Sequence, residues 1–304
     1  MAYQTGTVTN SADLKSTIEA FAIASGGYSA ASGSLYNAGG AVRLTPYSTN
    51  QGLQIQGAND AAMSVKLCPA YIRLFVPTAN WPVTYHLFGF ASPSFVFCTV
   101  QYGVGDHQHM GFGDAIKFGS WTGGNWFSTG LGQNSGDTQG PRVLATSSGF
   151  DPYYYYGGWR TGAMFWNAMY NSTSYQTEGS MLHTELLGGT WPRSTMTAGP
   201  DRDIQIGVPQ YLDPLHLRMP NSISLQSQIL PMVISIERSG YHARIAQIPN
   251  MGVVRVDWME PGDIIYEGSQ KWKTFPWALK NASARDGGNG HSGTFGYAVK
   301  YDGP

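Results

Sequence analysis

The sequence predicts a mainly β protein: an antiparallel β-sandwich or barrel-like core with one N-terminal helix and long ordered loops rich in glycine and aromatic residues. Glycine accounts for 39 of the 304 residues and charged residues for only 12%, against typical values of about 7% and about 25%. Only six glutamates are present, whereas helical proteins cover their exposed faces with Glu, Lys, Arg and Ala. Apolar residues recur in short runs with a period of two, separated by Gly, Pro and Asn, which is typical of strands and turns.

Charge and hydrophobicity exclude further classes of protein. Lys and Arg number 18 against 19 Asp and Glu, so the net charge of −1 provides no field that would attract nucleic acid or an anionic membrane. The hydrophobic content of 42% is too high for a disordered chain. The first ten residues are polar, and no window approaches the roughly 18 apolar residues of a membrane span. We therefore expect a folded protein made in a reducing cytoplasm, with no cofactor, nucleic-acid partner or membrane anchor.

The first segment, residues 1–118, is predicted to form a helix packed on an antiparallel sheet. Asn10 or Ser11 caps the helix, Asp13 lies in its first turn, and Gly26-Gly27 ends it. Leu14, Ile18 and Phe21 recur within it at helical spacing. Strands are expected around residue 35 and at residues 41–44, 53–56, 71–76, 83–90 and 94–102. The last two are joined at Ala91-Ser92-Pro93, as in a hairpin.

The middle segment, residues 119–228, is predicted to be a loop-rich insertion between the two parts of the core. It contains three elements in which a Gly-Gly pair is associated with a tryptophan, at residues 123–126, 151–159 and 188–192, and few apolar runs long enough for core strands. Long loops in a compact domain are usually functional or interfacial, because their backbone polar groups need partners. We therefore expect this segment to contact other chains.

The last segment, residues 229–304, is predicted to be a β-meander that completes the core, so that the three segments make one domain. Strands are expected at residues 232–238, 244–248, 252–256, 263–266 and 294–301. Turns are expected at Ser239-Gly240, Pro249-Asn250 and Pro261-Gly262.

No motif predicts a catalytic, cofactor or metal site. The cluster that most resembles a metal site is Asp106-His107-Gln108-His109, because alternate side chains on a strand point to the same face and its two histidines could share a metal. No other His or Cys has a sequence spacing that would complete a tetrahedral set of ligands. Asp201-Arg202-Asp203 is better explained by a local salt bridge than by a pair of catalytic carboxylates. Cys68 and Cys98 lie in apolar runs and are predicted to be buried free thiols. Phosphate-loop, dinucleotide and serine-elbow patterns are absent from the sequence, so the chain is not expected to be an enzyme.

Aromatic residues on glycine-rich loops are the other candidate site. Tyrosine and tryptophan provide large, rigid contact area at low entropic cost, both in protein interfaces and on carbohydrate platforms. The candidates for contact with a neighbouring subunit, or with a glycan, are Trp126, Tyr153, Tyr154, Tyr155, Tyr156, Trp159 and Trp191.

Several segments resemble structural proteins of tailed bacteriophages. The similar segments are Met1–Gly6, Gln108–Asp114, Gly119–Gly124, Glu260–Asp263, Trp272–Trp277 and His291–Ala298. The resemblance implies a virion protein of the tail, in its baseplate or tail tip, or else in the neck and collar. It supplies no catalytic residues.

The leading hypothesis is therefore an oligomeric phage tail protein, assembled in the cytoplasm of the host bacterium, that binds neighbouring tail or baseplate proteins through its loops. One alternative is a tail-fibre or spike module that binds a host-surface glycan through Tyr153–Tyr156, Trp126 and Trp159. A further alternative is a polysaccharide-degrading tail enzyme with Asp201, Asp203 or Glu185 as its base.

Overall fold

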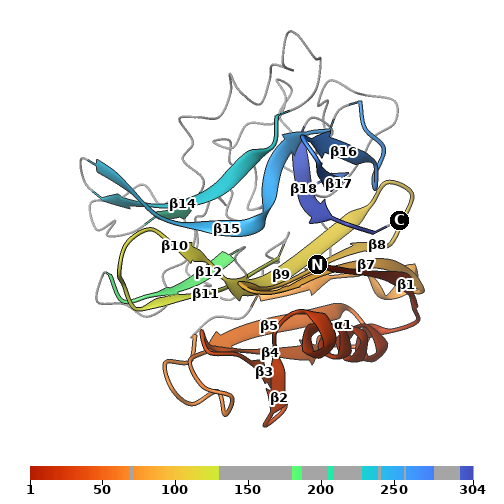
Figure 1. Cartoon of the computed structure of the whole chain (residues 1–304). Coiled ribbons are helices and arrows are strands. Elements are labelled where there is room, and N and C mark those ends of the chain that lie inside the picture. The colour runs from red at the N-terminus through yellow and green to blue at the C-terminus, as the bar shows by residue number, and fades with distance from the viewer. Residues whose placement is uncertain are drawn as a thin grey trace.

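The computed structural model describes residues 1–68, 72–129, 180–186, 205–207, 228–238, 241–256, 258–276 and 295–303. Their strands form three antiparallel sheets stacked in layers, which we call the lower, central and upper sheets (Figure 1). The predicted class, mainly β with a sandwich-like core and one N-terminal helix, is confirmed. None of the three sheets closes into a barrel within the described part of the chain.

The single α-helix, α1 (Ser11–Ser25), begins and ends where the sequence predicts. Asn10 has an extended backbone, and its Oδ1 accepts a hydrogen bond from the backbone N–H of Asp13 at 2.9 Å. At the other end, the N–H of Gly26 donates to the carbonyl oxygen of Ala22 at 2.9 Å. The side chains at helical spacing are buried between the central and lower sheets: Leu14, Ile18, Phe21 and Ala22.

The central sheet has six strands in the order β1-β7-β8-β9-β11-β12. They are β1 (Ala2–Val8), β7 (Val83–Ala91), β8 (Ser94–Gln101), β9 (His107–Asp114), β11 (Gly123–Thr129) and β12 (Ser180–Thr184). The predicted hairpin is present, since β7 and β8 pair from Thr84 with Gln101 to Ala91 with Ser94.

The lower sheet has five strands in chain order, followed by the short 3-10 helix η1 (Thr78–Asn80). The strands are β2 (Ser29–Ala31), β3 (Ser34–Tyr36), β4 (Ala41–Pro46), β5 (Gly52–Ala58) and β6 (Ile72–Phe75). The strands expected from period-two apolar runs in this region are therefore confirmed.

The upper sheet follows the order β13-β14-β15-β18-β17-β16, and the short strand β10 also pairs with β15. Its strands are β10 (Ile116–Lys117), β13 (Gln205–Gly207), β14 (Leu230–Arg238), β15 (Tyr241–Arg255), β16 (Ile264–Glu267), β17 (Gln270–Pro276) and β18 (Phe295–Tyr301). The turn expected at Pro249-Asn250 is wrong, because both residues lie inside β15. The chain there forms a bulge, with a positive φ of 58° at Asn250, and the register with β14 shifts beside it.

Strands β11 and β12 correct the expectation that residues 119–228 lie outside the core. Both strands belong to the central sheet, and most of their residues are buried. Alternation of apolar and polar residues did not reveal these strands, because layers cover both faces of this sheet. Polar residues such as Asn125 and His183 are therefore buried at positions that an alternating pattern would assign to the solvent-exposed face. The expected division at residue 118 therefore passes through the central sheet.

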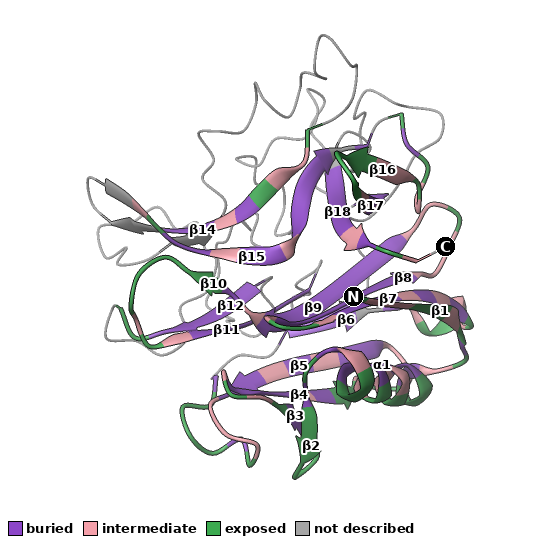
Figure 2. Ribbon diagram, viewed as in Figure 1, coloured by how far each residue is buried: buried purple, intermediate pink, exposed green. Residues whose placement is uncertain are grey.

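Two hydrophobic cores lie on either side of the central sheet. One is formed with α1 and the lower sheet, and the other with the upper sheet, which is why buried residues dominate β8, β9 and β11 (Figure 2). Cys68 and Cys98 are buried as free thiols, as predicted. The described chain contains no helix with the length and hydrophobicity that crossing a bilayer requires.

Candidate functional site

The His-Gln-His strand is packed into the interface between the central and upper sheets. The ring of His109 stacks on Phe97 with centroids 5.9 Å apart. His107 donates from Nδ1 to the carbonyl oxygen of Gly105 at 3.0 Å, and burial lowers the pKa of His107 to about 4. Among the described residues, His107 and His109 belong to no group of three His, Cys, Asp or Glu side chains that could hold a metal ion. Burial therefore favours the neutral form of His107, and the ring of His109 contributes to the packing against Phe97.

The two cysteines also belong to the packing of the protein. Both lie in the core between the central and lower sheets. Burial raises the pKa of the Cys98 thiol far above its usual range. Because the thiolate is the reactive form of cysteine, this environment suppresses nucleophilic chemistry at Cys98.

A second group of polar side chains lies between the central and lower sheets. We call it the polar seam, and its members are Tyr28, Asn37, Asn59, Asp114, Asn125 and His183. Asp114 and Asn125 are directly paired across β9 and β11. His183 on β12 lies opposite the bulge of β11 that contains Asn125. The central sheet thus contributes a row of three polar residues from three neighbouring strands.

The turn after β3 connects the lower sheet to this row. Asn37 Nδ2 donates to Asp114 Oδ2 at 2.8 Å, and Asn37 Oδ1 accepts from the backbone N–H groups of Gly39 and Gly40 at 2.8 and 3.0 Å. A Cβ atom at Gly39 would overlap Asp114 Oδ1, and one at Gly40 would crowd the carboxamide of Asn125. Glycine at both positions allows the turn to approach these two side chains closely.

Burial dominates the electrostatics of the polar seam. It raises the pKa of Asp114 to about 6, although the hydrogen bond from Asn37 and the charge of Lys117 act in the opposite direction. It also lowers the pKa of His183, with a smaller effect from Lys66. The pKa of Tyr28 is raised by burial first and by the charge of Asp114 second.

Several polar atoms of the polar seam are buried without a hydrogen-bond partner. They are Tyr28 Oη, Asn59 Oδ1, Asp114 Oδ1 and both side-chain polar atoms of Asn125. A buried polar group without a partner costs about 1–3 kcal/mol. Such groups are uncommon in folded proteins, so a concentration of them marks a candidate binding site.

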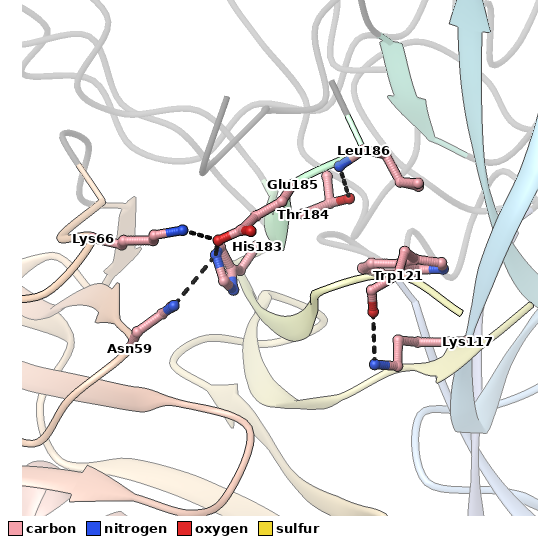
Figure 3. A network of polar contacts seen from close by, with 8 residues as sticks. All are labelled: Asn59, Lys66, Lys117, Trp121, His183, Thr184, Glu185 and Leu186. Carbon is pink, nitrogen blue, oxygen red and sulfur yellow. Dashed lines mark hydrogen bonds and ion pairs between the residues drawn. The ribbon is translucent and has the colours of Figure 1, made fainter. Parts of the chain in front are cut away.

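The polar seam reaches the surface beside Glu185 (Figure 3). His183 Nε2 lies 3.4 Å from Asn59 Nδ2 and 3.9 Å from Glu185 Oε1. Glu185 also forms an ion pair with Lys66, and this pair connects the end of β12 with the loop after β5. Glu185, considered above as a possible catalytic base, is thus placed in an ion pair at the rim, and Asp201 and Asp203 lie outside the described residues.

Exposed apolar side chains flank these charged residues along the chain: Val65 and Leu67 flank Lys66, Ile116 and Phe118 flank Lys117, and Leu186 follows Glu185. We call them the junction surface, formed by Val65, Leu67, Ile116, Phe118 and Leu186. Their three chain segments are connected by contacts: Lys66 pairs with Glu185, the backbone N–H of Glu185 donates to the Thr122 carbonyl oxygen at 3.0 Å, and Lys117 Nζ donates to the Trp121 carbonyl oxygen at 2.9 Å. Figure 3 shows Lys66, Glu185 and Lys117 in this neighbourhood.

The aromatic candidates from the sequence are placed differently. Trp126 is completely buried in the core between the central and upper sheets, where its ring centroid lies 6.0 Å from that of Phe95. The prediction of Trp126 as an interface or glycan contact is therefore wrong, because the residue has no exposed surface. Tyr153, Tyr154, Tyr155, Tyr156, Trp159 and Trp191 lie outside the described residues.

The polar seam was missed by sequence reasoning. Asp114 and Asn125 are eleven positions apart and belong to no motif, and the lower-sheet residues precede them by more than fifty positions. The available signal was an Asn followed closely by Gly-Gly at residues 37–40, which is typical of a tight turn with a special backbone. Searches with known family models and among curated proteins found no match to the chain.

Proposed function

We propose that this chain is a structural protein of a tailed-bacteriophage virion, positioned in the tail tip or baseplate, where it binds neighbouring tail proteins. The observation that carries this proposal is the junction surface. Its five apolar side chains have exposed fractions between 41% and 51%, and they are five of the eleven large apolar residues exposed in the described chain.

Because contacts connect the three segments, we infer that these side chains form one apolar patch, and such patches are characteristic of interaction sites, since monomeric proteins rarely leave them in water. The low charge of the whole chain, 12%, supports the same role. Charged groups are depleted in interface cores, since removing them from water is costly. The resemblance to phage structural proteins supplies the biological setting of the proposal, and copies of the chain itself are among the proposed partners.

The described titratable groups are consistent with a binding role. His107 and Cys98 are held in their neutral forms by burial, and Glu185 is occupied by Lys66. These groups stabilise contacts between layers, and no catalytic step is needed to explain their positions.

The test is incorporation into particles of the virus that encodes the chain. We expect mass spectrometry of purified virions to detect the unmodified chain, and antibody labelling to locate it on the tail. The variants Phe118→Asp and Leu186→Asp should be incorporated at least tenfold less, because a carboxylate placed in a desolvated contact is strongly unfavourable. The matched control is Ile23→Asp, whose parent residue is at least as exposed, at 49%, but lies on α1 away from the junction surface.

The proposal fails if the unmodified chain is absent from purified particles. Full incorporation of both junction-surface variants, at the level of Ile23→Asp, would remove the junction surface as the contact even if the chain is a virion protein.

A further inference from the structure

Two side chains of the polar seam that have partnerless atoms, Asp114 and Asn125, lie against the glycine turn of the lower sheet. Asp114 and Asn125 are cross-strand partners, and such partners have Cβ atoms about 4.5–5.5 Å apart on the same face. The carboxylate of Asp114 lies against Gly39, and the carboxamide of Asn125 lies against Gly40. The ring of Tyr28 packs edge to face on Phe112, two positions before Asp114 on β9, with the ring centroids 5.2 Å apart.

Three of these atoms are oxygens that accept hydrogen bonds or bind cations. Asp114 Oδ1, Asn125 Oδ1 and Tyr28 Oη are each buried and without a partner. Both Asn125 and Tyr28 are more than nine-tenths buried, with exposed fractions of 0% and 4%. The other carboxylate oxygen of Asp114 is already bonded to Asn37, so the partnerless oxygen is the one available to a ligand.

We propose that the polar seam binds a hard cation of the calcium class, with Asp114 Oδ1, Asn125 Oδ1 and Tyr28 Oη as its protein ligands. Carboxylate and amide oxygens are preferred ligands of Ca²⁺, whereas zinc and copper select imidazole and thiolate. The cation would satisfy three buried acceptors together and neutralise the charge of the Asp114 carboxylate. With a single carboxylate in the set, the dissociation constant should lie near 10⁻⁴–10⁻³ M, roughly the range of weak calcium sites.

The groups around the polar seam are compatible with a bound cation. Burial lowers the pKa of His183 and so disfavours the charged form of its ring. Lys66 is engaged by Glu185. The Lys117 amine, whose charge acts on Asp114, donates to the carbonyl oxygen of Trp121, outside the seam.

The experiment is thermal unfolding of the purified chain at pH 7.5 in CaCl₂ up to about 10 mM, with NaCl at matched ionic strength as the reference. We expect calcium to raise the Tm of the unmodified chain by about 2–5 °C, since a ligand of the folded state stabilises it by mass action. Asp114→Asn should abolish this rise. Asp106→Asn, which removes a half-buried carboxylate beside the other end of β9, should retain it.

Two results would overturn the proposal: no calcium-specific rise in the unmodified chain, or a full rise in Asp114→Asn. If Asp114→Asn does not fold, crystals of the unmodified chain soaked in Tb³⁺ decide the question. An anomalous peak between Asp114 and Asn125 supports the site, whereas ordered water alone at these atoms contradicts it. The assay uses no virus particles, so its failure leaves the proposed virion role intact, and absence from virions leaves the cation site intact.

Discussion

The two interfaces of the central sheet are built by different means. Towards the upper sheet, one paired polar contact lies within an aromatic core: Thr99 Oγ1 and Tyr297 Oη share a buried hydrogen bond of 2.6 Å, and the rings of Phe97 and Tyr297 meet edge to face at 5.0 Å. Towards the lower sheet, an aliphatic core that includes α1 ends in the polar seam, where Asp114 and Asn125 retain partnerless atoms.

The difference distinguishes polar groups that stabilise the packing of two layers from polar groups that are available to bind a ligand. A polar group whose partner comes from the facing layer stabilises the contact between layers, as Thr99 does with Tyr297. A buried polar group without a partner destabilises the fold unless a ligand completes it. The upper interface is therefore self-sufficient at these residues, and the lower interface is the place to look for a ligand.

The largest expected effect on the free energy of unfolding comes from removing an aromatic ring at the upper interface. Phe97 is completely buried and contacts the rings of Phe95, Tyr297 and His109. Phe97→Ala should lower the free energy of unfolding by about 3–5 kcal/mol, because the cavity cannot collapse between two sheets. Urea denaturation measures the change.

Phe118→Ala is the matched control for this comparison, since Phe118 is 41% exposed. It should change the free energy of unfolding by less than about 0.5 kcal/mol. Equal losses in the two variants would show that the upper interface is not the main source of stability at these positions.

The next effect is the pH dependence of the upper interface. Burial lowers the pKa of both His86 and His107 from 6.5 to about 4. Between these values the unfolded chain binds more protons than the folded chain, so acidification favours unfolding. The contribution of both histidines to the free energy of unfolding is fully present above pH 6.5 and is lost as the pH falls towards 4.

Denaturation at a series of pH values checks this expectation. His107→Gln should show a shallower decline than the unmodified chain between pH 6.5 and 4, because glutamine does not titrate. An unchanged slope in this variant would mean that His107 takes up its proton without unfolding, and that the upper interface tolerates charge.

The smallest effect is expected at the lower interface. Asn125→Leu replaces a buried carboxamide that lacks partners by an apolar side chain of similar size. In calcium-free buffer the free energy of unfolding should stay within about 1 kcal/mol of the unmodified value, or rise. A loss above about 2 kcal/mol would show that the carboxamide is paired in the folded protein, and the contrast between the two interfaces would disappear.

Local signals in the sequence predict the fold class well. The cap at Asn10, the apolar positions of α1 and the Gly26-Gly27 stop all lie within one short stretch of chain, and the helix follows them. The hairpin of β7 and β8 is equally local. Pro249-Asn250 was misjudged because a bulge inside a strand and a reverse turn use the same residues, and pairing with β14 decides between them.

The candidate site could not be predicted in the same way. The sequence directed attention to His107 and His109, whose alternation suggested a shared ligand, and to Trp126, whose glycine neighbours suggested a loop. All three are buried by the layers that cover the central sheet. Burial by a second layer is a property of the assembled sheets, and no local pattern reports it.

The sequence by itself determined a low-charge, glycine-rich β protein with one N-terminal helix, since composition, capping and turn chemistry act over a few residues. Only the tertiary structure decided which polar residues meet. The register of β9 with β11 places Asp114 opposite Asn125, and the stacking of the lower sheet brings Asn37 and Tyr28 to them. Such meetings depend on strand register and layer packing between distant segments, which sequence spacing does not encode.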